Sequence, residues 1–173
     1  MNLSKIKENR VRKKLNKQLL KTNTKRTVSQ KEIMTVGILT LDSISSKIDL
    51  QTEIETIIGV RNTKIYSFKK FDKLDDASFK HFSEKDINWK GDFIQPNFKS
   101  FIETPFDLLI GFFNEENLYL EKAVYNSKAT FKVGFSNVNS NLYEMEIHSE
   151  IENVEQFSTE LKKYLKILKK LKN

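Results

Sequence analysis

Three short apolar runs constrain the fold of this chain more than any other feature. They are Val36–Leu41 (VGILTL), Asp107–Phe113 (DLLIGFF) and Phe131–Phe135 (FKVGF). A strand with one face in water alternates apolar and polar residues, whereas a nearly continuous apolar run is typical of a strand that is covered on both faces. The runs therefore predict central strands of a mainly parallel sheet.

Segments with helical spacing lie between these runs. Asp42 or Ser43 can cap a helix after the first run and Asn114 one after the second, because short polar side chains accept hydrogen bonds from the first N–H groups of a helix. Tyr143–Ile147 alternates apolar and acidic residues like an edge strand, and Asn153 can open a final helix. The sequence predicts an α/β fold, a three-layer Rossmann-like sandwich with a mainly parallel sheet of about five strands.

Charge is segregated along the chain. Residues 1–29 carry ten Lys and Arg against one acid, and residues 161–173 carry six Lys and no acid. The 131 residues between them hold 14 Lys and Arg against 22 acids, so a mildly acidic body lies between two basic ends. We expect a basic helical leader and linker over residues 1–29 and a single α/β domain over residues 30–173.

The leader is predicted to be helical from Lys5 to Lys21, since it lacks Gly and Pro and is rich in good helix formers. Five of its cations recur at spacings of three and four residues, which aligns them along one face. These candidate anion-binding residues are Lys7, Arg10, Lys14, Lys17 and Lys21. Val11, Leu15 and Leu19 are expected on the opposite face, and Thr22–Ser29 is expected to be a linker.

Polar residues that follow the predicted strands are the candidates for a ligand pocket. In an open α/β sheet, ligands bind beyond the carboxyl ends of the strands. The candidates are Asp42, Ser43 and Ser45 after the first strand, Asn114 and Glu115 after the second, and Ser136 and Asn137 after the third. The alternative is that these residues cap helices or lie in solvated loops, where they are favoured for backbone hydrogen bonding alone.

For the C-terminal lysines, the two histidines and the tryptophan, the sequence favours ordinary structural roles. The lysines of the C-terminal helix are expected to form a solvated face: Lys162, Lys163, Lys166, Lys169 and Lys170. Neither His81 nor His148 has a readable catalytic partner, so surface or capping roles are expected. Trp89 is expected to anchor the core or a loop rather than to serve as a stacking platform.

Composition excludes several classes of site. The chain has no Cys, which removes disulfides, thiol nucleophiles and thiolate metal ligands, and it has only two His. Its five Gly lie far apart, so no dinucleotide fingerprint or phosphate-binding loop can be written, and no cofactor is expected. No apolar run approaches the ~20 residues of a membrane helix, and we expect a cytoplasmic location.

The strings Thr104–Ile110 (TPFDLLI) and Lys128–Phe135 (KATFKVGF) carry a resemblance. Over nearly the whole chain, the sequence resembles an uncharacterised bacterial family of small α/β proteins with a basic N-terminal helix, a resemblance that implies a fold and no chemistry. Over about 30 residues the same strings resemble the N-terminal half of heptosyltransferase-like glycosyltransferases. Because we expect no second domain that could hold a nucleotide sugar, that likeness implies no catalytic residue.

These observations favour a non-enzymatic binding protein whose leader docks on an anionic partner, namely RNA, DNA or a ribonucleoprotein, because phosphate contacts need many cations and little special geometry. Three alternatives stay open. The leader can attach to an anionic membrane surface, or it can bind a protein partner. The strand-end pocket can belong to a small enzyme, a reading that rests on analogy of fold.

Overall fold

The computed structural model describes residues 2–22, 28–75 and 80–172. It contains one six-stranded sheet with the order β3-β2-β1-β4-β5-β6, and every neighbouring pair is parallel. The strands are β1 (Val36–Leu41), β2 (Thr63–Phe68), β3 (His81–Phe82), β4 (Leu108–Phe112), β5 (Lys132–Phe135) and β6 (Met145–Ile147). The helices are α1 (Leu3–Lys21), α2 (Asp42–Ser45), α3 (Leu50–Ile58), α4 (Pro96–Glu103), α5 (Leu118–Asn126) and α6 (Val154–Ile167).

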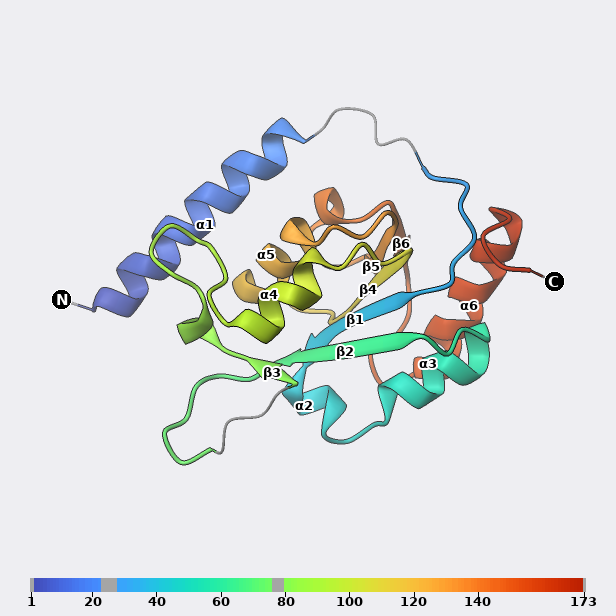
Figure 1. The fold of residues 1–173 in the computed structure, drawn as a ribbon, viewed down its shortest axis with the longest axis horizontal. Coiled ribbons are helices and arrows are strands. Elements are labelled where there is room, and N and C mark those ends of the chain that lie inside the picture. Colours follow the sequence, from blue (N-terminus) through green and yellow to red (C-terminus); the bar gives the residue numbers. More distant parts are fainter. Residues whose placement is uncertain (1, 23–27, 76–79, 173) are drawn as a thin grey trace.

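Helices cover both faces of the sheet, so the three-layer Rossmann-like α/β prediction is confirmed (Figure 1). On one face α4 and α5 pack against β2, where Tyr66 contacts Phe98 and Phe68 stacks on Tyr119. On the other face, Phe157 of α6 packs against the ring of Phe112. This double cover explains the continuous apolar runs: every residue of β4 is buried.

Strand order reverses between β1 and β4. From β1 the chain builds outward through β2 to β3, and from β4 it builds the other way through β5 to β6. The carboxyl ends of β1 and β4, at Leu41 and Phe112, therefore flank the crevice where this fold class binds ligands. About five strands were predicted, and the described residues form six; the shortest, the two-residue β3, pairs with Ser67 and Phe68 of β2.

The helix predicted after the first strand is divided in two. The four-residue α2 begins at Asp42 itself, and neither Asp42 nor Ser43 caps it, because its N-cap position is Leu41. The longer α3 starts separately, with the Asp49 carboxylate accepting from the N–H of Thr52. The predicted cap at Asn114 is also wrong, since Asn117 caps α5, whereas the predicted cap of α6 at Asn153 is confirmed.

Asp107 joins the starts of the two central strands. Its buried carboxylate accepts hydrogen bonds from Nζ of Lys31, from the N–H groups of Met34 and Thr35, and from the Thr35 hydroxyl. Burial alone would raise the pKa of Asp107, but these hydrogen bonds outweigh burial and lower it. The carboxylate thus stays charged and holds the segment before β1 against the start of β4.

Two strand glycines make room for an aromatic ring. Tyr143 is buried and lies flat across Gly111 of β4 and Gly134 of β5, so a Cβ atom at either position would overlap the Tyr143 ring. These are the glycines within the LLIGFF and KVGF strings. Here glycine serves close approach rather than an unusual backbone conformation.

The leader helix α1 is docked on the body. Val11, Leu15 and Leu19 are at most 3% exposed and belong to the same apolar core as the sheet. In Figure 1, α1 runs along the outer side of α5, with which it makes contact. The predicted helix is confirmed, and residues 23–27 of the predicted linker lie outside the described residues.

Replacing Leu109 by Asp should unfold the protein. Leu109 is fully buried in β4 between β1 and β5, where an unpaired carboxylate has no compensating partner. Circular dichroism and thermal unfolding measure the effect. Lys64→Asp, which places the same group at an exposed position of β2, is the control and should unfold like the wild type. A soluble Leu109→Asp protein with cooperative unfolding would contradict the assignment of β4 as a central strand.

A fragment of residues 30–173 should fold cooperatively, because all six strands lie within residues 36–147. It should be less stable than the full chain, since loss of α1 uncovers the surface that Val11, Leu15 and Leu19 bury, and each such side chain contributes about 1.5–3 kcal/mol. Thermal unfolding of the two forms tests this. A fragment without a cooperative transition would show that α1 is an obligatory part of the core.

Candidate functional site

Packing of α1 divides its cations into two groups. Lys7 and Lys14 flank the buried apolar stripe and turn toward the segment of residues 84–92. Nζ of Lys7 donates to the carbonyl of Glu84 at 3.0 Å, and burial lowers the pKa of Lys7. Nζ of Lys14 donates to the carbonyl of Lys90 at 2.5 Å and lies 4.0 Å from the Asp92 carboxylate. These two lysines hold α1 in place.

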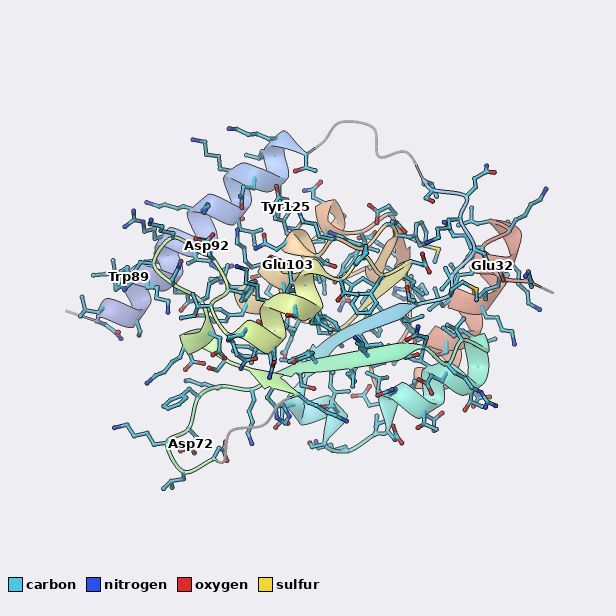
Figure 2. The ribbon with its side chains drawn as sticks, viewed as in Figure 1. Glu32, Asp72, Trp89, Asp92, Glu103 and Tyr125 are labelled. Atoms are coloured by element: carbon cyan, nitrogen blue, oxygen red, sulfur yellow. The ribbon has the colours of Figure 1, made fainter. Side chains whose placement is uncertain are left out.

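The other three predicted cations, Arg10, Lys17 and Lys21, are exposed. Lys13 is exposed as well, and with them it completes a row at spacings of three, four and four residues, which places all four on one side of the helix. We call Arg10, Lys13, Lys17 and Lys21 the outward row. Among the described residues none of the four has a hydrogen-bond or ion-pair partner, and Figure 2 shows nitrogen-tipped side chains projecting from α1 away from the sheet.

Lys13 was missed because the repeat that begins at Lys7 passes over it. Which cations face solvent depends on the rotation of α1 about its axis, and the burial of Val11, Leu15 and Leu19 sets that rotation. Arg12, the remaining cation in the middle of the helix, pairs with Glu8 at 3.6 Å. The outward row is therefore a set of cations that α1 exposes to solvent.

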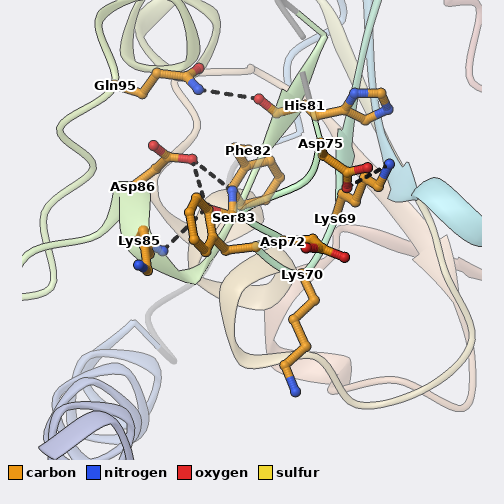
Figure 3. A pocket seen from close by; sticks show the side chains of 11 residues that line it. Lys69, Lys70, Asp72, Asp75, His81, Phe82, Ser83, Lys85, Asp86 and Gln95 are labelled. Atoms are coloured by element: carbon orange, nitrogen blue, oxygen red, sulfur yellow. Dashed lines mark hydrogen bonds and ion pairs between the residues drawn. The ribbon is translucent and has the colours of Figure 1, made fainter. Parts of the chain in front are cut away.

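The carboxyl ends of β1, β2 and β3 form a second polar region. Asp42, which follows β1, lies 2.9 Å from Nε2 of His81 on β3. Lys69, which follows β2, lies 4.0 Å from the Asp42 carboxylate and 3.0 Å from that of Asp75. Two hollows of about 430 and 550 Å³ adjoin these groups, and Figure 3 shows His81, Lys69 and Asp75 around the first of them.

This strand-end region has mixed charge. The first hollow is lined by three Lys and three Asp, and the second by two Lys and two Asp, each together with His81. A histidine oriented by a carboxylate can accept or donate a proton, so the Asp42–His81 pair is suited to acid–base chemistry on a neutral ligand. Among the described residues, no three His, Asp or Glu side chains gather as a metal site.

The predicted pocket residues fall into two groups. On the β1 side, Asp42 meets His81, Oγ of Ser45 lies 2.7 Å from Oγ of Ser67, and Ser43 is exposed. On the β4 side, Nδ2 of Asn137 donates to the carbonyl of Asn114 at 2.8 Å.

Each group also includes a histidine to which sequence reasoning gave no such role. His81 belongs to the β1 group, and on the β4 side Oγ of Ser136 lies 3.2 Å from Nδ1 of His148. Each contact joins two segments that the sheet brings together, so no local spacing could reveal them.

The C-terminal lysines were expected to form a solvated face, and for Lys170 this expectation is wrong. Lys170 is 1% exposed, its Nζ donates to the carbonyl of Ser29, and it lies 4.7 Å from the centre of the Phe131 ring. Burial lowers the pKa of Lys170. Lys163 and Lys166 are exposed as predicted. The basic C-terminal segment thus uses one of its cations to hold the chain that precedes β1.

Lys122 lies between α5 and the leader. It is 1% exposed, and its Nζ donates to Oε1 of Gln18 on α1 at 2.8 Å. The pKa of Lys122 is lowered to about 8, mainly by burial and also by the charge of Lys14, while the Asp92 carboxylate opposes both effects. The ordinary lysine pKa of 10.5 applies to the unfolded chain.

A lowered lysine pKa means that the folded protein disfavours the charged form. Stability should therefore rise as the pH increases from about 8 to 10.5, by an amount on the order of 3 kcal/mol for this shift. Lys122→Met should remove this rise and leave stability at neutral pH equal or higher. Denaturant unfolding across this pH range measures it, with the exposed Lys128→Met as control. Identical pH profiles for wild type and Lys122→Met would refute the prediction.

Comparison with known proteins identifies a family and no activity. Among the described residues, no helix is long and apolar enough to cross a membrane. No curated protein and no solved structure gives a significant match. A family of unknown function matches residues 7–168, a range that runs from the leader helix through the whole sheet to the end of α6. This match spans far more than half of the sequence, and the protein therefore belongs to the family of unknown function DUF6913.

Proposed function

We propose that the protein is a nucleic-acid-binding protein and that the outward row of α1 contacts the phosphate backbone. The observation that carries the proposal is the state of this row: four exposed cations on one side of a helix, without acidic partners among the described residues. Such a row on a mildly acidic body gives a local field that attracts polyanions. Phosphate contacts require cations in reach and little further geometry.

Docking of α1 strengthens the proposal. Because Val11, Leu15 and Leu19 are buried, the helix is already held in one orientation, and binding does not have to order it. From Arg10 to Lys21 the row spans about 16 Å at 1.5 Å per residue. A row of this length can reach several neighbouring phosphates of one strand.

Attachment to an anionic membrane is the second candidate. Its support is three exposed apolar side chains on α1, Leu3, Ile6 and Leu20. The regular apolar stripe that would enter the lipid is instead buried against the body, and α1 itself carries no Trp or Phe of the kind that interfacial helices use. We therefore favour nucleic acid.

Binding to an oligonucleotide should depend steeply on salt. If all four cations of the outward row contact phosphates, the log–log slope should be about −3.6 for duplex DNA and about −2.8 for a single strand. Between about 50 and 200 mM salt this predicts a loss of affinity of about 150-fold and about 50-fold, respectively. Fluorescence anisotropy with labelled RNA and DNA measures the slope and separates the two nucleic acids.

Charge reversal locates the contact. Arg10→Glu, Lys17→Glu and Lys21→Glu together should abolish binding at about 50 mM salt without changing the melting temperature, because these side chains have no partner in the described fold. The control reverses Lys162, Lys163 and Lys166 on α6, an equal change in net charge, and should keep most of the affinity.

Absence of salt-dependent binding of the wild type to either nucleic acid would remove the proposal. Flotation with vesicles that contain phosphatidylserine would in that case decide for the membrane.

A further inference from the structure

A rigid turn lies against the leader helix. The carbonyl of Asn88 accepts from the N–H of Gly91 at 3.1 Å, and the Asn88 side chain accepts from the N–H groups of Lys90 and Asp92. Gly91 has a φ of +84°, a conformation that glycine adopts without strain. Trp89 and Lys90 are thus the two residues at the tip of a well-ordered turn.

This turn is fixed at its base and along its side. Ile87 and Phe93 pair across the base in an antiparallel bridge, and both are buried. Lys14 of α1 donates to the carbonyl of Lys90, and Lys14 also lies within 4.0 Å of the Asp92 carboxylate. The turn and α1 therefore form one continuous surface, with Lys14 as the link between them.

Trp89 is a large aromatic side chain that this turn leaves 43% exposed, so it does not anchor the core. In Figure 2 it is labelled beside the N-terminal half of α1, in agreement with the contact between Lys14 and the adjacent Lys90. A single exposed aromatic residue needs no explanation by itself. Here it is held on a rigid turn, next to an exposed lysine and attached to a helix that carries four cations without partners in the described part of the chain.

We propose that Trp89 is a stacking platform for a base of single-stranded nucleic acid whose phosphates follow the outward row of α1; this inference rests on the proposed function. Proteins that bind single strands combine a cationic track for the backbone with aromatic side chains on which bases stack. A duplex keeps its bases stacked inside the helix, so its bases cannot reach the ring. The platform makes the protein prefer single strands over duplexes and over polyanions that lack bases.

The chain contains one Trp, so tryptophan emission, excited at a wavelength that Tyr does not absorb, reports on this position alone. Titration with oligouridylate or oligothymidylate of about 15 nucleotides should quench the emission, whereas inorganic polyphosphate, which offers charges without bases, should bind without comparable quenching. Trp89→Ala should weaken oligonucleotide binding by at least about fivefold and leave polyphosphate binding unchanged. Tyr164→Ala on α6, which removes a similarly exposed ring, should change neither affinity.

The outcomes separate this inference from the proposed function. Salt-dependent oligonucleotide binding that is lost on reversal of the outward row, but without quenching and with full affinity in Trp89→Ala, would overturn the stacking platform and leave the phosphate contact standing. Failure of the wild type to bind the oligonucleotides, whether or not it binds polyphosphate, would overturn both. Equal melting temperatures of Trp89→Ala and wild type show that the turn is intact.

Discussion

Burial of β1 and β4 on both faces is the constraint on which the rest of the structure depends. Because both faces of these strands are apolar, helices must cover each face of the sheet. Because neighbouring strands are parallel, crossover connections must join them. The chain meets this demand with α4 and α5 on one face and with α3 and α6 on the other. Asp107 adds the local restraint that holds the starts of β1 and β4 together, at the centre of the reversal in strand order.

A helix, strand or cap could be predicted from the sequence only where a short stretch of neighbouring residues determines it. The central strands could be predicted because each is a nearly continuous apolar run. The leader helix and the cap at Asn153 could also be predicted from short stretches of sequence. The two-residue β3 has no such signature, because only its pairing with β2 defines it. The division between α2 and α3 was likewise missed, since the Asp49 cap interrupts a helical pattern that continues across it.

The candidate functional surfaces likewise combine features that the local sequence predicts with features that only tertiary packing determines. The basic character of α1 was plain, but membership of the outward row depends on which way Val11, Leu15 and Leu19 turn the helix, and that is set by packing. The Asp42–His81 contact joins residues 39 positions apart and could not be read from spacing. Trp89 was expected in a structural role because nothing in its neighbours reveals that a turn lifts it away from the core.

Tyr143 makes three distant positions interdependent. Its ring occupies the space that side chains at positions 111 and 134 would otherwise fill, so both positions require glycine as long as position 143 is tyrosine. A methyl group added at either strand position can be tolerated only when a shorter residue replaces the tyrosine, and a shorter residue alone leaves a void over the sheet. We therefore expect the three positions to change together, because a change at any one of them is restrained by the other two.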